Sequence, residues 1–456
     1  MSKKNKIDLG SSPVGKTFWR YAIPSILAMT AQSAAGMINS IFIGRTVGPE
    51  GLTAITLLMP IVMFLIGLAT MVAIGGTTRA GIELGKGNPV KSNNMFNVTL
   101  SSLAILGLLS TAIVNLLLTR IADLAGATGE ARLYLLQYGR TLSPFILFFL
   151  LNFSFIFFLK LDGRPIIAVS IAVFGTILNI LLGYILIVML GMKVKGAALA
   201  TGISQLIPFL MLSTAILIKS RWTIRRPVFR RKDIFNILFN GSSELLSNSA
   251  YSISGFLFNI IIMKRIGVTG VAAYAVSLQM AALANAIGYG FAESNQTGIS
   301  YNYGAGKLVR VRSFLRYTLS ASLAAGIIIF FITFFLGEKI SLIFIKDPAT
   351  LKLAGHILKF YAFAFLVSGW NISLGTYYTA IGDPRLSGLL TLYRALLSLM
   401  IGLLLFPTIF GDNGIWMALL FAEGTSLILG IIIHRWKPFG LDFKEIKEKG
   451  KIRKTA

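Results

Sequence analysis

The chain has 456 residues, of which 55% are hydrophobic and 13% are charged, and its formal net charge at pH 7 is +26. Soluble domains typically carry about 25% charged residues, so this composition excludes an ordinary water-soluble globular protein. The chain contains no cysteine, which excludes a disulfide framework and thiol chemistry.

Apolar stretches long enough to cross a bilayer recur along the chain. Six contain no Asp, Glu, Lys or Arg, at 22–44, 51–78, 92–119, 165–192, 196–218 and 268–292. Shorter or interrupted stretches lie at 141–159, 234–263, 317–337, 360–382, 386–410 and 413–434. About 20 apolar residues of an α-helix cross the hydrocarbon core, and a helix satisfies its own backbone groups there. The sequence therefore predicts an all-α polytopic membrane protein with twelve transmembrane helices.

The placement of the basic residues predicts the orientation of these spans. About 30 of the 43 Lys and Arg residues fall on the side that holds both termini, and about ten fall on the opposite side. Cytoplasmic loops carry such an excess, so both termini are expected in the cytoplasm. The basic segment at 219–232 is then expected to contact anionic lipid headgroups rather than nucleic acid.

The second half of the chain repeats the first at an offset of 219 residues. Gly48 and Gly267 match, Gly85 matches Gly304, and Gly163-Arg-Pro matches Gly382-Asp-Pro. An even number of spans separates each pair, which indicates a parallel repeat with a site between its halves. We expect lobes at 1–218 and 234–436, a basic linker at 219–233 and a basic tail at 437–456. This organisation favours a transporter over a channel.

Enzymatic and nucleotide-driven functions find little support in the motifs. The two histidines, His356 and His434, have no metal-ligand partner at a suitable spacing. The stretch GIELGKGNP (81–89) lacks the spacing and the Ser or Thr of a phosphate-binding loop. We therefore expect no enzymatic activity, no metal and no cofactor, and transport driven by an H⁺ or Na⁺ gradient.

Several longer segments of the sequence are similar to those of a known family. The start SSPVGKTFWRYAIPSIL, the segment GRPIIAVSIAVFGTILNILL (163–182) and the segment GISYNYGAGKLVRVRS (298–313) stand in order along the duplicated chain. The chain resembles the multidrug and toxic compound extrusion (MATE) transporters, in particular their bacterial multidrug branch. The resemblance implies two six-helix lobes in a V around a central cavity. It also implies export of amphipathic, often cationic compounds across the bacterial inner membrane. We expect the protein to be a monomer, with small organic compounds and membrane lipids as its partners.

The chain departs from the family at a cation site in the first lobe. The resemblance implies an acidic residue in span one, an Asn-x₃-Asp in span five and a Thr in span six. The matching positions hold Asn39, Asn179 with Gly183, and Thr201, so both carboxylates are missing. Neutral oxygens alone bind Na⁺ poorly and carry no transferable proton. We expect this degenerate site not to couple transport.

Ionisable residues inside the spans are the remaining candidates for coupling, since each costs about 2.5 kcal/mol or more at a helix centre. Glu244 begins a polar helical stripe and is predicted to face the cavity of the second lobe as the principal coupling carboxylate. Glu293, in the next span, is the second candidate. A structural role for Glu244, as a hydrogen-bond partner of a neighbouring helix, stays open. The other expected cavity residues are Asn248, Tyr251, Ser252, Asn259, Tyr289 and Asn371.

Arg394 and Glu423 lie centrally in spans eleven and twelve, and we expect them to form a buried structural pair. Two other functions remain as alternatives to drug export. A lipid-linked oligosaccharide flippase of the same superfamily would move an anionic head, and this chain has few basic residues within its spans. A receptor or scaffold without transport would not need Glu244.

Overall fold

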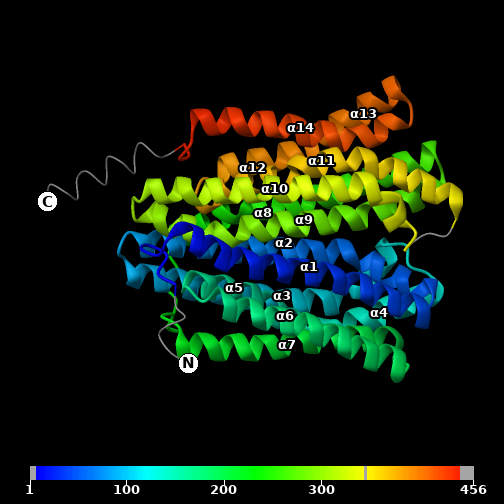
Figure 1. The fold of residues 1–456 in the computed structure, drawn as a ribbon. Coiled ribbons are helices and arrows are strands. Elements are labelled where there is room, and N and C mark those ends of the chain that lie inside the picture. The colour runs from blue at the N-terminus through cyan, green and yellow to red at the C-terminus, as the bar shows by residue number, and fades with distance from the viewer. Residues whose placement is uncertain (1–6, 344–346, 442–456) are drawn as a thin grey trace. The chain divides into compact units, whose positions relative to one another are not determined.

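The computed structural model describes residues 7–343 and 347–441, and within them every regular element is helical. The terminal residues 1–6 and 442–456, which include most of the predicted basic tail, lie outside the described residues. Figure 1 labels the α-helices along the chain, and the shorter 3₁₀ and π-helical turns are named η. Up to residue 219 they are α1 (Val14–Thr46), α2 (Pro49–Gly85), α3 (Pro89–Leu124), α4 (Gly129–Leu142), η2 (Ser143–Phe145), α5 (Ile146–Leu161), α6 (Pro165–Gly183), η3 (Tyr184–Met189) and α7 (Lys193–Lys219).

The second half continues in the same manner. Its helices are α8 (Arg231–Arg265), α9 (Val268–Gly304), α10 (Leu308–Ser341), α11 (Pro348–Ala380), α12 (Pro384–Leu392), η4 (Tyr393–Leu397), α13 (Ser398–Phe410) and α14 (Asn413–Trp436). Adjoining short helices form continuous spans, as at 129–161 and 384–410. The described residues thus contain twelve helices long and apolar enough to cross a membrane, which confirms the predicted spans.

Matched turns show why both halves adopt the same fold. Gly48 and Gly267 have φ of 93° and 83°, and Gly163 and Gly382 have φ of 82° and 81°. Glycine adopts such backbone angles without the steric cost that a side chain would impose. After three of these glycine turns the next helix begins with a proline, at Pro49, Pro165 and Pro384. The first N–H groups of a helix have no intrahelical acceptor, so a proline there costs no hydrogen bond. The repeat seen in the sequence therefore fixes turns at matched positions.

The chain divides into two compact units, Met1–Gly241 and Ser242–Ala456. Within the first unit α2 packs on α3, α3 on α5, and α6 on α7. Within the second unit α9 packs on α10, α10 on α11, and α13 on α14. These helices are the counterparts, at the offset of 219 residues, of the helices that pair in the first unit. The division falls inside α8, so the basic linker at 219–233 packs with the first unit. The lobe boundaries predicted above stay a prediction.

Each unit has its own core of buried apolar residues. In the first unit the core includes Ile43, Leu118 and Leu135, from α1, α3 and α4. In the second it centres on Trp416 of α14, which stacks on Tyr274 of α9 with ring centroids 6.4 Å apart. These cores hold the helices that carry the polar residues described next.

Candidate functional site

A small polar cavity lies inside the second unit. Its volume is about 30 Å³. About 10–15 Å³ is enough for one water, so the cavity has room for water or a small cation and no room for an organic compound. Its lining comes from α8, α9, α11, α12 and η4 and consists of Ser243, Glu244, Ser247, Tyr289, Asn371, Ile372, Gly375, Thr376, Ser387, Leu390, Thr391 and Arg394.

Glu244 enters this cavity from α8 together with two serines on the same helical face. Positions 243, 244 and 247 lie within one turn, so their side chains meet the same wall. Ser247 Oγ shares a hydrogen bond of 3.3 Å with the Tyr289 hydroxyl of α9. Ser243 Oγ shares one of 3.2 Å with Thr379 Oγ1 of α11. These hydrogen bonds tie residues 243–247 of α8 to α9 and α11 and leave Glu244 at the small polar cavity.

Asn371 and Arg394, which line the cavity, both bind Glu423, which lies behind the lining. Arg394 Nη1 donates to Glu423 Oε1 at 2.9 Å, and Asn371 Nδ2 donates to Glu423 Oε2 at 2.7 Å and to the Glu423 carbonyl at 2.9 Å. Glu423 is 5% exposed and Asn371 is 8% exposed. Both carboxylate oxygens of Glu423 are therefore occupied, which makes it a fixed counter-ion rather than a free base.

The backbone around Arg394 departs from regular α-helix. Residues 393–397 form a π-helical turn between α12 and α13. A π-turn inserts one extra residue and so rotates the side chains that precede it relative to those that follow, and such turns are common at functional sites. Here it joins two helical segments of one span at the residue that carries the guanidinium.

The first unit repeats part of this arrangement without the charges. Asn152 Nδ2 donates to the Gln205 carbonyl at 2.9 Å and to Gln205 Oε1 at 3.0 Å. Asn371 contacts Glu423 through the same pair of atoms, and Asn152 and Asn371 stand at the repeat offset of 219. The neutral Gln205 is thus replaced by an anion in the second unit. The offset between the two asparagines was the sequence signal that could have found this pair.

The degenerate first-lobe residues also come together. Asn39 Nδ2 donates to Asn179 Oδ1 at 2.6 Å, and Asn179 Nδ2 donates to Ser204 Oγ at 3.2 Å. Ser204 donates in turn to the Thr201 carbonyl at 2.8 Å. A Cβ added at Gly183 would lie 3.1 Å from Asn39 Oδ1, so that position adjoins the cluster. The amides and hydroxyls satisfy one another, and sequence reasoning missed Ser204.

The other predicted site residues on α8 lie away from the small cavity. Asn248, Ser252 and Asn259 each donate to the carbonyl one turn earlier in their own helix, at 2.9, 3.1 and 2.9 Å. Tyr251 is 52% exposed. A part for these residues in a substrate cavity stays a prediction. Glu293 is half-buried on α9, within electrostatic range of Glu244.

Within residues 7–343 and 347–441, twelve helices are long and apolar enough to span a membrane, they repeat in two units, and one of them carries a carboxylate at a small polar cavity. This arrangement defines a membrane transporter rather than an enzyme. The family profile described as MatE matches residues 24–185 and 245–404, one segment in each half of the repeat. The match covers most of the chain, and the chain therefore belongs to the MatE family.

Individual relatives agree with this assignment. The chain is 26% identical over 429 residues to the multidrug export protein MepA of Staphylococcus saprophyticus, covering 92% of this chain and 94% of that protein. It is 25% identical over 439 residues to MepA of Staphylococcus aureus strain N315, covering 92% and 94%. An outward-facing multidrug resistance MATE transporter has the same fold, with a TM-score of 0.91 at 22% identity over 96% of this chain and 98% of that one.

Proposed function

We propose that this chain is a secondary active multidrug exporter of the bacterial inner membrane, which exchanges amphipathic organic cations for an inward flow of protons. The names of the relatives support export of drugs. The observation that carries the coupling mechanism is the placement of Glu244 at a cavity sized for water or a small ion. A carboxylate there can bind and release a proton without admitting the drug itself.

Exchange follows if drug and proton compete for the charge on Glu244. With Glu244 ionised, a cationic compound in the transport pathway is stabilised by attraction to the carboxylate. With Glu244 protonated, that attraction is lost and the compound is released. Only a difference in affinity between the two states can drive transport, and the charge of one carboxylate supplies such a difference.

The surroundings of Glu244 favour a proton over Na⁺ as the coupling ion. Of the described residues that line the cavity, Glu244 is the one carboxylate, and the Arg394 guanidinium beside it is paired with Glu423, so the lining offers a metal ion a single anionic ligand. Na⁺ also prefers several oxygen ligands, whereas a proton needs only the carboxylate itself. The neutral cluster of Asn39, Asn179 and Ser204 offers no group in the first unit that exchanges protons at neutral pH. We therefore assign coupling to the second unit alone.

Proteoliposomes loaded with ethidium test this function directly. We expect efflux against a concentration gradient when a proton gradient is imposed, and little efflux when a sodium gradient replaces it. A broad panel of organic cations that is moved under neither gradient would contradict drug export. Movement of a lipid-linked oligosaccharide by the same vesicles would then make the chain a flippase.

The orientation of the spans is a separate prediction, with both termini in the cytoplasm. It depends on the excess of basic residues on the side of the termini. A green fluorescent protein fused after truncation within 219–232 should fluoresce, and alkaline phosphatase fused there should be inactive. Fusions after Gly126, at the opposite ends of the spans, are the control and should behave in the reverse way. Active phosphatase at 219–232 would invert the topology.

A further inference from the structure

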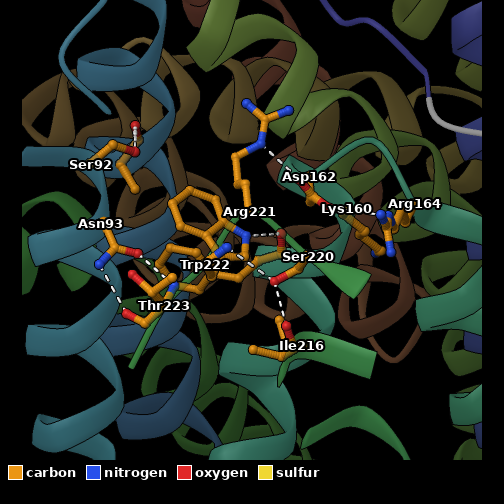
Figure 2. Close-up of polar contacts among 12 residues, drawn as sticks. Ser92, Asn93, Lys160, Asp162, Arg164, Ile216, Ser220, Arg221, Trp222 and Thr223 are labelled. Carbon is orange, nitrogen blue, oxygen red and sulfur yellow. Dashed lines mark hydrogen bonds and ion pairs between the residues drawn. The ribbon is translucent and has the colours of Figure 1, made fainter. Parts of the chain in front are cut away.

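An extended segment, residues 221–230, connects α7 to α8 and is here named the strap. Three asparagines in the first turns of α3 hold its backbone, and Figure 2 shows the first of these contacts. Asn93 Nδ2 donates to the Thr223 carbonyl at 2.9 Å and its Oδ1 accepts from the Thr223 N–H at 2.9 Å. Asn94 makes the same two contacts with Val228, at 3.1 and 2.9 Å.

The third asparagine completes the pattern. Asn97 Oδ1 accepts from the Arg225 N–H at 2.9 Å, and its Nδ2 donates to the Thr223 carbonyl at 3.0 Å. A side-chain amide carries the same donor and acceptor as a peptide unit, so the three asparagines act on the strap as the edge of a neighbouring strand would. The asparagines of α3 therefore bind the backbone of the strap, and most side chains of the strap take no part in these hydrogen bonds.

Two residues at the start of the strap anchor it more deeply. Trp222 is 3% exposed, packs against Phe96 and Phe158, and donates its Nε1–H to the Phe158 carbonyl at 2.9 Å. Arg221 Nε donates at 2.7 Å to Asp162, which is fully buried (Figure 2). The strap thus begins at a fixed point on the first unit.

Beyond Trp222 the strap presents basic and apolar side chains together. Ile224, Val228 and Phe229 are 55%, 56% and 48% exposed. Arg225, Arg226 and Arg230 are also exposed. These residues lie outside the membrane-crossing helices, so the acyl chains that cover apolar residues of the spans do not cover them. Three exposed apolar side chains among arginines need a partner that accepts both kinds of group.

The position of the strap identifies that partner. It leaves α7 at the end of one span and enters α8 at the start of the next, so both its ends are tied to the bilayer surface. The headgroup region receives apolar side chains on its inner side, and its anionic lipids attract arginine. A nucleic acid would match the charges and leave Ile224, Val228 and Phe229 in water.

We propose that the strap is a docking surface for anionic phospholipid headgroups, with Ile224, Val228 and Phe229 inserted into the interface and Arg225, Arg226 and Arg230 on the phosphates. The asparagines of α3 hold the strap extended, so that both sets of side chains are presented at a constant depth. Lipid composition then acts on the first unit at the junction between α7 and α8. This surface is independent of the transport mechanism proposed for Glu244.

Because the chain has no cysteine, one reporter can be placed on the strap of the full protein. Phe229→Cys is labelled with a nitroxide and reconstituted into bilayers of phosphatidylcholine, alone or mixed with phosphatidylglycerol. Collision with oxygen, which partitions into lipid, is compared with collision with a water-soluble nickel chelate. We expect the oxygen-to-nickel ratio to rise severalfold on adding phosphatidylglycerol, because each basic residue near an anionic surface contributes about 1 kcal/mol, which is about fivefold in an equilibrium constant.

The triple change Arg225→Gln, Arg226→Gln, Arg230→Gln should remove this dependence on phosphatidylglycerol. The matched control is Arg45→Gln, Arg120→Gln, Lys195→Gln, which removes the same charge from exposed positions at the opposite ends of spans in the same unit and should retain it. Efflux activity and monodisperse elution verify that both variants are folded. The proposal is overturned if the label reports equal water exposure in both bilayers, or if both triple variants behave alike. It is also overturned if an RNA oligonucleotide protects the label and phosphatidylglycerol does not.

Discussion

The Glu244→Gln variant is expected to lose gradient-driven efflux completely and to release ethidium no faster than liposomes without protein. Glutamine keeps the size and the hydrogen-bonding oxygen of the side chain while removing the group that takes up a proton. Since the cavity around Glu244 is shaped by Ser243, Ser247 and Tyr289, an isosteric change should leave it intact. Expression and elution of the purified variant should therefore match the unsubstituted protein.

Glu130→Gln is the matched control, because Glu130 is an exposed carboxylate near the start of α4. It removes the same charge from the chain and should pump at the original rate. Binding of labelled drug gives a second readout, since Glu244→Gln mimics the protonated carboxylate and should bind a cationic drug more weakly, with an affinity that does not respond to pH. If Glu244→Gln pumps uphill at the original rate, coupling does not depend on Glu244, and Glu293 becomes the carboxylate to test.

The second large effect concerns stability. Arg394→Leu leaves the buried carboxylate of Glu423 without its cationic partner. Breaking a buried ion pair on one side typically costs about 3–5 kcal/mol. For a unit of roughly 200 residues this corresponds to a fall in Tm of about 10 °C. Thermal unfolding of the purified protein in detergent, followed by tryptophan fluorescence, measures the change.

The double variant Arg394→Leu, Glu423→Gln separates this explanation from simple loss of packing. It converts the second unit to the neutral pair found in the first, with Asn371 donating to a glutamine as Asn152 does to Gln205. Because no buried charge remains unpaired, the double variant should recover most of the lost Tm. A double variant as unstable as Arg394→Leu would show that the guanidinium stabilises the unit through packing rather than through its charge.

The two units differ in charge around these matched asparagines. Asn152 and Asn371 make equivalent contacts with a backbone carbonyl and a side-chain oxygen, but the side-chain oxygen belongs to an amide in the first unit and to a carboxylate paired with Arg394 in the second. Transport by two matched lobes does not require matched charges. In this chain the first unit has the neutral cluster around Asn179 and the second has the carboxylates, which is consistent with coupling in one unit.

Several features followed from the sequence because they depend on local composition. Twelve spans were predicted from apolar length alone, since a helix in lipid satisfies its backbone groups internally and rises a constant distance per residue. The matched turns at Gly48 and Gly267 followed from the repeat, since positive φ selects glycine wherever the fold recurs. Glu244 stood out because a carboxylate within a span is costly.

Only the tertiary structure decided which of these side chains meet. The polar stripe on α8 suggested that Asn248, Ser252 and Asn259 share the cavity of Glu244, whereas the cavity lining takes Ser243 and Ser247 from that helix. The hydrogen bonds of Ser243 with α11 and of Ser247 with α9 show which face of α8 is turned toward the cavity, and the periodicity of the sequence does not specify that rotation. The partners of Asn371 and of the strap lie 52 and about 130 residues away in sequence. Such contacts depend on how whole helices pack together, and no local pattern specifies that packing.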